Sequence, residues 1–157
     1  MNQSWSEAEL AYFAGIVDGE GCFAMHKHGG GIYGTQLQVG NTDLLLMQWI
    51  HRRFGGSLAL ERHSNPKHQH MWRWYAKASD LDLITRSLIP YLITKKRQAE
   101  IFLAFRATLN GKASAGPRAR GVGASTARHS TAVKAERERI HAELLALKRP
   151  LKEAVTH

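Results

Sequence analysis

Segments of helical periodicity and pairs of strand-like segments alternate along the first 109 residues, and this order limits the folds open to the chain. Apolar side chains recur at helical spacing in four segments: 7–18, 44–54, 80–88 and 96–109. Two pairs of short alternating runs lie between them, 22–28 with 32–39 and 57–61 with 70–76. We therefore predict an α+β fold with one four-stranded antiparallel sheet that carries helices on one face.

Alternation gives each predicted strand an apolar and a polar side. The apolar sides carry Phe23, Met25, Leu37, Val39, Leu58, Leu60, Trp72 and Trp74, which we expect the helices to cover. The polar sides are rich in His, Gln, Ser, Arg and Tyr and poor in Lys and Glu. An ordinary solvated face is one interpretation. The other is a DNA-binding face, because Gln can pair with adenine and Arg with guanine in the major groove.

The charge of the chain indicates a polyanionic partner. Lys and Arg total 22 against 13 Asp and Glu, for a net charge of +9, which points to nucleic acid or a membrane surface. No apolar run approaches the roughly 18–20 residues of a membrane span, and the acidic N-terminal segment lacks the pattern of a signal peptide. A single cysteine excludes an internal disulfide. We expect a cytoplasmic bacterial or phage protein, or one in a DNA-containing organelle.

The basic residues concentrate in the last third of the chain, where 110–157 holds 10 basic against 4 acidic side chains. We expect a domain at 1–109, a flexible basic loop at 110–131 and a C-terminal helical extension at 132–157. The loop has almost no large apolar side chain to bury. It is either a linker or a basic arm that lies along phosphates.

The first predicted helix has two unusual features. Gly15 and Gly19 lie four residues apart beside Ala11 and Ala14, and such a smooth face lets a second helix approach closely. Two carboxylates, Asp18 and Glu20, stand at the end of this helix in an otherwise basic chain. If two copies pack through the small face, their Glu20 side chains converge. Paired carboxylates beside DNA repel phosphate unless they hold a divalent metal ion.

The sequence Phe-Ala-Gly-Ile-Val-Asp-Gly-Glu-Gly at residues 13–21 resembles the LAGLIDADG motif of homing endonucleases. Only one motif is present, and the resemblance extends over about residues 6–109. It implies a saddle-shaped sheet and a homodimer that cuts both strands of a long pseudo-palindromic duplex across the minor groove. It further implies Mg²⁺ as cofactor, with Mn²⁺ as a possible substitute, and an origin in a mobile intron or a free-standing gene.

The resemblance also implies roles for individual residues. Glu20 would bind the catalytic metal together with the backbone carbonyl of Gly19. Asn41 would position water or metal, with a cap of the second helix as the alternative. Lys95 would contact the active-site water and phosphate, with the neighbouring Lys96 as the alternative. A basic residue sometimes found in the second helix is replaced here by Leu45. The expected dimer interface comprises Ala11, Ala14, Gly15, Asp18 and Gly19, with Asp18 also bonding backbone at the helix ends.

The side chains expected to contact DNA are His26, His28, Gln36, Gln38, Glu61, Arg73 and Tyr75. Two functions from different classes are compatible with these features. One is an active endonuclease, which the presence of Glu20 favours. The other is a non-cleaving nucleic-acid-binding protein on the same scaffold, such as an intron maturase or a transcription regulator.

Overall fold

The computed structural model describes residues 4–28, 32–62, 70–110 and 131–148. Its elements follow in the order α1 (Glu7–Glu20), β1 (Gly21–Lys27), β2 (Tyr33–Asn41), α2 (Leu44–Phe54), β3 (Ser57–Glu61), β4 (Met71–Tyr75), α3 (Leu81–Leu88), α4 (Lys96–Asn110) and α5 (Thr131–Lys148). The predicted α+β class and element order are confirmed. The boundaries shift by a few residues: β2 continues to Asn41, and His28 lies just beyond β1.

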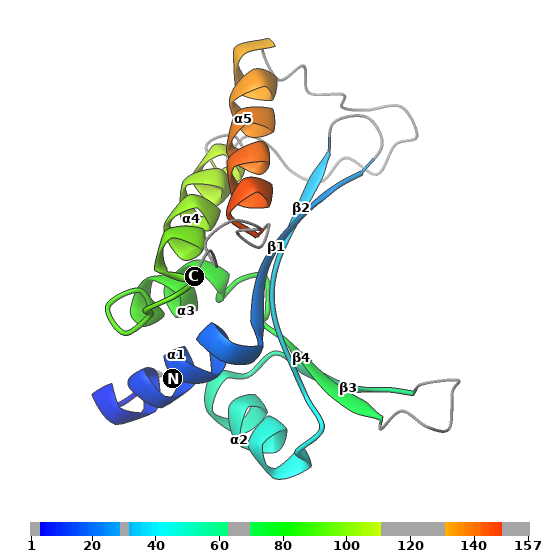
Figure 1. The fold of residues 1–157 in the computed structure, drawn as a ribbon, viewed down its shortest axis with the longest axis vertical. Coiled ribbons are helices and arrows are strands. Elements are labelled where there is room, and N and C mark those ends of the chain that lie inside the picture. The colour runs from blue at the N-terminus through cyan, green and yellow to red at the C-terminus, as the bar shows by residue number, and fades with distance from the viewer. Residues whose placement is uncertain (1–3, 29–31, 63–69, 111–130, 149–157) are drawn as a thin grey trace, which may run out of the picture.

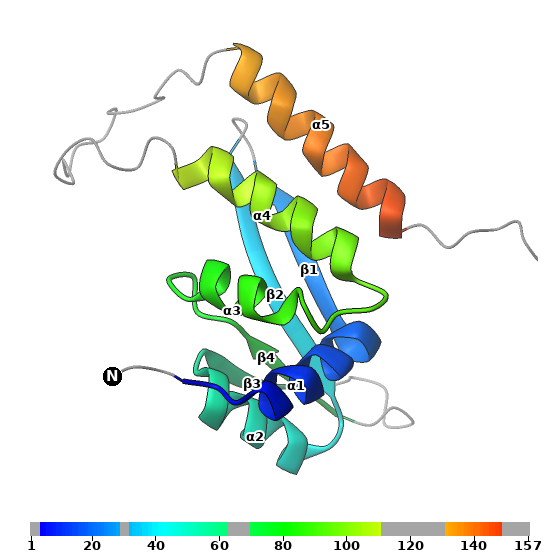
Figure 2. The ribbon, with the colours of Figure 1, turned by 90° about the vertical axis from the view of Figure 1, so that its left-hand side faces the viewer.

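The four strands form one antiparallel sheet in the order β1-β2-β4-β3. The sheet is strongly bent, and the helices lie on one side of it while the opposite face is uncovered (Figure 1). Viewed from the helical side, the helices stand in front of the strands (Figure 2). This arrangement leaves one curved face of the sheet open over the described residues.

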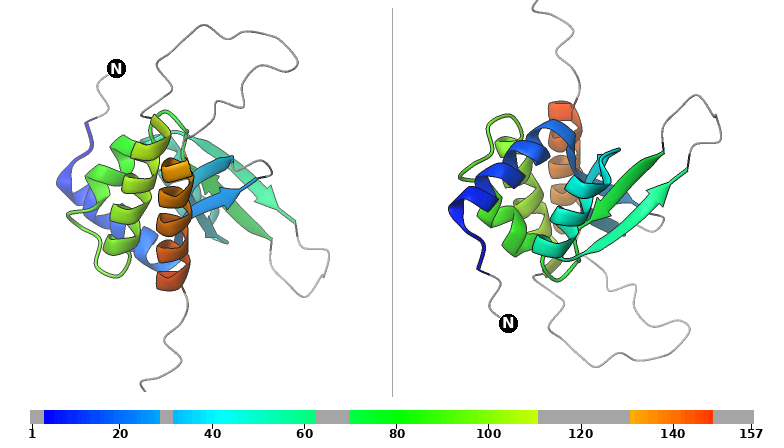
Figure 3. Two further views of the ribbon diagram at one scale, coloured as in Figure 1. Left: turned by 90° about the horizontal axis from the view of Figure 1, so that it is seen from above. Right: turned by 90° about the horizontal axis from the view of Figure 1, so that it is seen from below.

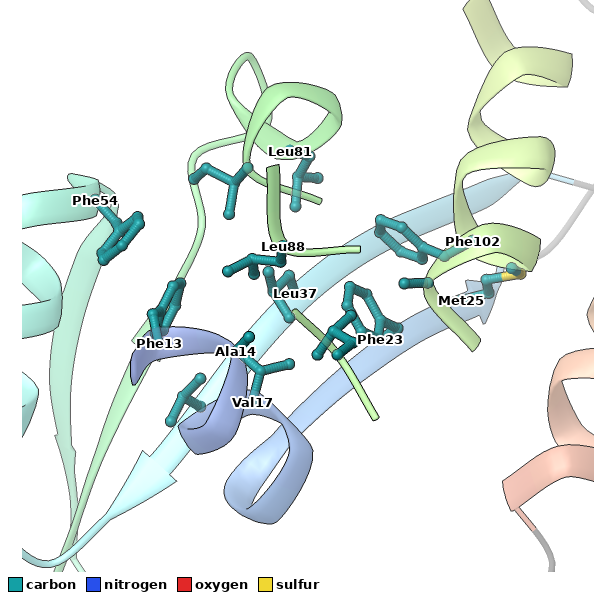
Figure 4. Packing of buried hydrophobic residues seen from close by; sticks show 14 of the residues in the cluster. Phe13, Ala14, Val17, Phe23, Met25, Leu37, Phe54, Leu81, Leu88 and Phe102 are labelled. Carbon is teal, nitrogen blue, oxygen red and sulfur yellow. The ribbon is translucent and has the colours of Figure 1, made fainter. Parts of the chain in front are cut away.

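Most of the apolar strand side chains form the core with the helices, as predicted, whereas Leu58 and Trp72 are only partly buried against it and Leu60 is half-buried outside the cluster. Phe23, Leu37, Val39 and Trp74 have no exposed surface. From the helices, Phe13 and Val17 of α1, Leu81 and Leu88 of α3 and Phe102 of α4 pack against them (Figure 4). Burying these large side chains stabilises the fold by roughly 1.5–3 kcal/mol each.

Local capping sets the starts of the helices. The Ser6 side chain accepts a hydrogen bond from the Glu9 backbone N–H, and the Glu9 carboxylate accepts one from the Ser6 N–H, which is the predicted capping box. At the start of α2, the Asp43 carboxylate accepts from the Leu46 N–H at 3.1 Å. These bonds satisfy N–H groups that the helices leave unpaired.

A glycine pair makes the tight connection between α2 and β3. Gly55 and Gly56 have positive φ angles of 67° and 81°. A Cβ atom on Gly56 would lie 2.2 Å from the Tyr75 carbonyl oxygen, so no other residue fits there without movement of the backbone. The indole N–H of Trp74 donates to the Gly55 carbonyl at 2.6 Å and ties this turn to the core.

The C-terminal helix α5 lies beside α4 (Figure 3). Its Ile140 and Leu144 are buried in the same hydrophobic cluster as the core of the first 109 residues. The buried Arg137 donates to the Thr108 carbonyl at 2.7 Å. Of the basic loop predicted at 110–131, residues 111–130 lie outside the described part of the chain, while Asn110 ends α4 and Thr131 begins α5.

Candidate nucleic-acid interface and metal centre

Helix α1 runs directly into strand β1, and Glu20 is the last helical residue. The Glu20 side chain is exposed. The next residue has no room for a side chain, because a Cβ on Gly21 would lie 2.7 Å from the Val17 carbonyl oxygen and 2.8 Å from the Val17 Cα atom. The glycine at position 21 therefore allows the helix to pass into the sheet without an intervening loop, and it places the Glu20 carboxylate at the junction.

Asp18 lies two residues before Glu20 on α1, and its side chain binds the segment that precedes α4. Its carboxylate accepts hydrogen bonds from the Ile93 N–H at 2.7 Å, the Lys95 N–H at 2.8 Å and the Thr94 hydroxyl at 3.0 Å. Partial burial raises the pKa of Asp18, but these hydrogen bonds outweigh it and hold the pKa below its ordinary value. The expectation that Asp18 bonds backbone at helix ends is met.

The ammonium group of Lys95 lies on the C-terminal end of α1. Its Nζ donates to the carbonyl oxygens of Val17 at 2.9 Å, Asp18 at 2.8 Å and Gly21 at 2.8 Å. Burial lowers the pKa of Lys95, while the negative charges of Asp18 and Glu20 oppose this shift. A cation at a helix C-terminus is favoured by the helix dipole. Lys96 is instead exposed as the first residue of α4, so Lys95 is the lysine that lies beside the acidic end of α1.

Asn41 ends strand β2, and its side chain contributes to the start of α2. The Asn41 Oδ1 atom accepts from the Asp43 N–H at 2.8 Å, while Asp43 itself is the N-cap residue. The structure therefore gives Asn41 a local role next to the helix start. A role of the Asn41 amide nitrogen in positioning water or metal stays a prediction.

The strand register brings the predicted DNA-contacting residues onto one face. Gln38 pairs across the sheet with Cys22 on β1 and with Tyr75 on β4. Gln36 pairs with Ala24, and His26 pairs with Gly34. Two predicted contacts bind each other: the Arg73 guanidinium donates to both Glu61 oxygens, at 2.8 and 2.7 Å. His26 and His28 are exposed, with His28 just outside the strand.

The small-residue face of α1 is accessible in the single chain. Ala11, Gly15 and Gly19 are exposed, and a Cβ atom built on Gly15 or on Gly19 would meet nothing within 4 Å. The prediction of Ala14 as an interface residue is wrong. Ala14 has no exposed surface and belongs to the hydrophobic core, because it lies one helical step round from Gly15, on the side that faces the sheet.

Sequence reasoning missed Lys148, the last described residue of α5. Its Nζ atom donates to the Phe23 carbonyl and lies 3.3 Å from the Cys22 sulfur. Lys95 binds the Gly21 carbonyl, two residues earlier on the same edge strand. Two ammonium groups, one from the segment before α4 and one from α5, therefore lie along the start of β1. The only sequence signal for Lys148 was its charge in the last turn of a helix.

The oxygen atoms at the end of α1 suit a hard divalent cation that takes only some of its ligands from the protein. Within the described residues, no group of three or more His, Cys, Asp or Glu side chains could hold a metal ion. Mg²⁺ typically takes one or two protein carboxylates and fills its other positions with water and substrate phosphates. The Glu20 carboxylate and the Gly19 carbonyl oxygen match that requirement. The three carbonyl oxygens that accept hydrogen bonds from Lys95 belong to other residues, namely Val17, Asp18 and Gly21.

No protein-family model and no curated protein sequence matches this chain. Among solved structures, the homing endonuclease I-CvuI in complex with DNA in the presence of 2 mM Mg is similar over 95% of this chain and 87% of its own, with 18% identity and a TM-score of 0.64. The archaeal intron-encoded homing endonuclease I-Vdi141I, complexed with DNA, is similar over 96% of this chain and 89% of its own, with 15% identity and a TM-score of 0.66. A double mutant of I-SmaMI is matched over 47% of its length, at 15% identity and a TM-score of 0.55.

The chain has the LAGLIDADG endonuclease fold. In this LAGLIDADG endonuclease fold, Lys95 and Lys148 donate to carbonyl oxygens at the start of β1, next to the acidic end of α1. No helix among the described residues is long and apolar enough to cross a membrane.

Proposed function

We propose that the chain is one half of a homodimeric endonuclease that recognises a long pseudo-palindromic DNA duplex and hydrolyses both strands with a divalent metal ion. The observation that carries this proposal is the position of Glu20. Glu20 is exposed, follows Gly19 of the small-residue face and ends α1 directly before strand β1. A dimer through that face would bring two such carboxylates together beside bound DNA.

The metal-binding group would be the Glu20 carboxylate with the Gly19 carbonyl oxygen. Mg²⁺, or Mn²⁺ in its place, would supply positive charge that stabilises the phosphate during attack by water. Lys95 would add a fixed cation next to the phosphate; three carbonyl oxygens at the end of α1 hold its ammonium group in place. Asn41 would orient water through the part of its amide that does not bind the Asp43 N–H.

The uncovered sheet face would supply DNA recognition. Curvature makes this face fit a cylindrical ligand (Figure 1), and the major groove admits β-strands whose side chains hydrogen-bond to base edges. Gln36, Gln38, Arg73 and Tyr75 all lie partly exposed on it. The net charge of +9 would be doubled in a dimer and would favour phosphate contacts. The I-CvuI and I-Vdi141I structures are themselves DNA complexes, which supports this use of the fold.

Two features support the homodimer. The chain matches about half of I-SmaMI, so this chain would provide one of two similar units. A groove of about 470 Å³ also lies beside the small face between α1 and α2, lined in part by Tyr12, Leu45 and Trp49. Tyr12 and Leu45 are 57% and 75% exposed. A second copy would bury this apolar surface.

Replacing Gly15 by leucine is expected to convert the dimer to a monomer without unfolding the chain. The single chain has open space at Gly15, and removing a glycine from a helix interior stabilises the helix by about 0.5–1 kcal/mol. The added side chain would instead separate two helices packed through this face. Sedimentation velocity would measure the change, with Ala107→Leu on an exposed position of α4 as the matched control. A wild-type monomer both with and without DNA would contradict the dimer.

Replacing Lys148 by methionine is expected to weaken DNA binding and to flatten its salt dependence. If Lys148 also contacts one phosphate in each chain, its loss should reduce the slope of log K against log[salt] by about 0.9 per chain, or about 1.8 per dimer. The control is Arg97→Met, which removes one cation that ties α4 to α5 through Glu143 at 2.8 Å. Equal slopes for wild type and Lys148→Met would show that Lys148 only attaches α5 to β1.

The decisive experiment on the proposed function begins with selection of bound duplexes from a randomised library. The selected duplex is then incubated with the full chain and Mg²⁺, and both strands are examined for breaks. We expect a double-strand cut at the centre of a pseudo-palindrome. Tight, selective binding without a nick in either strand would favour the non-cleaving alternative, a maturase or a regulator on the same scaffold.

A further inference from the structure

The pair formed by Arg73 and Glu61 lies on the polar face of the sheet, on the neighbouring strands β4 and β3. The Arg73 Nε atom donates to one Glu61 oxygen at 2.8 Å, and Nη2 donates to the other at 2.7 Å. The two side chains are 24% and 44% exposed. Two parallel bonds of this kind fix the plane of the guanidinium as well as its position.

The sheet leaves space for the guanidinium to lie across it. The residues directly opposite Arg73 on the two neighbouring strands are Gly40 and Ala59. A Cβ on Gly40 would lie 3.5 Å from the Arg73 Nη1 atom and 2.8 Å from the Met71 sulfur. Gly40 is therefore covered by these two side chains, and the small neighbours let Arg73 extend flat toward Glu61.

The pair uses only part of the hydrogen-bonding capacity of Arg73. A guanidinium has five N–H groups, and Glu61 takes one on Nε and one on Nη2. The other hydrogen of Nη2 has only the weak acceptor of Met71, with the sulfur 3.8 Å away. Nη1 donates to no acceptor within the described residues. Along the edge formed by Nη1 and Nη2, the N–H groups therefore have no oxygen acceptor within the described residues, as binding of a ligand with two acceptors would require.

The charges also determine which of the two side chains can contact DNA. Glu61 binds Arg73 with both of its oxygens, which leaves it poorly placed to accept a bond from a base. The Arg73 pKa is raised by its hydrogen bonds to Glu61, so the guanidinium stays charged. A carboxylate that faced DNA alone would be repelled by phosphate, and the pair removes that repulsion. Guanine offers two adjacent acceptors, O6 and N7, in the major groove, and these match the edge formed by Nη1 and Nη2.

We propose that Arg73 contacts a guanine through Nη1 and Nη2, and that Glu61 is a positioning residue for Arg73 and not a base contact. This inference rests on the proposed function, since it requires that the polar face enter the major groove. The sequence predicted Glu61 as a DNA contact, whereas here Glu61 positions Arg73. The inference also predicts one guanine at a fixed position in each half-site.

The test is selection from a randomised duplex library by the full chain, followed by sequencing of the bound pool. Wild type should enrich guanine at one position in each half-site. Arg73→Lys should reduce the guanine preference at that position by about 10- to 100-fold and leave other positions unchanged. Glu61→Gln should reduce it by about two- to tenfold, because the amide offers one acceptor in place of two.

The double variant identifies how Glu61 acts. If Glu61 works through Arg73, then Glu61→Gln adds nothing in the Arg73→Lys background. An effect of Glu61→Gln that persists there, or that appears at another position, would overturn the positioning role. Arg52→Lys, on the exposed surface of α2, is the matched control and should leave the profile unchanged.

The outcomes separate this inference from the proposed function. Selective wild-type binding with a guanine preference that Arg73→Lys does not alter would overturn the inference alone. No enrichment of any sequence by the wild type would contradict both. Thermal unfolding of each variant would verify that the fold is retained, and Arg73→Lys keeps the charge so that loss of general phosphate attraction is not mistaken for loss of specificity.

Discussion

Replacing Glu20 by glutamine is expected to reduce DNA cleavage by about a thousandfold or more while leaving DNA binding intact. The amide keeps the size of the side chain but removes the negative charge and one hard oxygen ligand. Charge stabilisation by a bound metal ion contributes several kcal/mol to such reactions, and about 4 kcal/mol corresponds to a thousandfold change in rate. Single-turnover cleavage of the selected duplex in Mg²⁺ measures the loss.

Glu7→Gln is the matched control for this experiment, because Glu7 is an exposed carboxylate in the first turn of the same helix. It should cut at the wild-type rate. Binding is compared in Ca²⁺, an ion with the same preference for oxygen ligands. A Glu20→Gln variant that cuts as well as wild type would show that the metal ligand lies elsewhere. A variant that no longer binds would show that Glu20 acts in recognition or assembly.

Replacing Asp18 by alanine is expected to destabilise the chain by about 2–4 kcal/mol. The substitution removes three hydrogen bonds to the segment before α4 and leaves two backbone N–H groups without their acceptor. In a chain of this length, that loss should lower the melting temperature by about 5–15 °C. Asp18→Asn should fall between alanine and wild type. Asp80→Ala removes a carboxylate at the start of α3 that makes no capping bond, and it should have little effect.

The stabilisation from Asp18 should depend on pH in a defined direction. The folded chain holds the pKa of Asp18 below its ordinary value of 3.8, so the unfolded chain binds the proton more tightly. The contribution is therefore fully present above about pH 4–5 and is lost as the pH falls below 3.8 toward the lowered folded pKa. Unfolding free energies of wild type and Asp18→Ala should converge at acidic pH. A constant difference down to pH 2 would contradict the carboxylate origin of the effect.

Much of the architecture could be predicted from local patterns. The two periodicities placed the helices and strands to within a few residues, because side-chain burial follows the geometry of each element. Ser6 with Glu9 predicted the start of α1, and alternation assigned Phe23 and Trp74 to the buried face of the sheet. These features depend on neighbours in the sequence or on one repeating direction.

The remainder depends on contacts between distant residues, which a single sequence does not contain. The small size of Ala14 was compatible with a free helix face, but only the packed sheet shows that it is buried. Lys148 lies 126 residues from Cys22 in the sequence, yet the two side chains are in contact. The bond between Glu61 and Arg73 follows from the register of β3 with β4, which residue types alone do not determine.

The direct passage of α1 into β1 at Gly21 has a consequence for how target sites can diversify. Because no loop separates the helix end from the first strand, the distance from the Glu20 carboxylate to each side chain on the open face is set by rigid secondary structure. Under the proposed function, the number of base pairs between the cut and each recognised base is then a constant of the fold. Substitutions on the strands would change which bases are recognised, while the spacing of the site would stay the same.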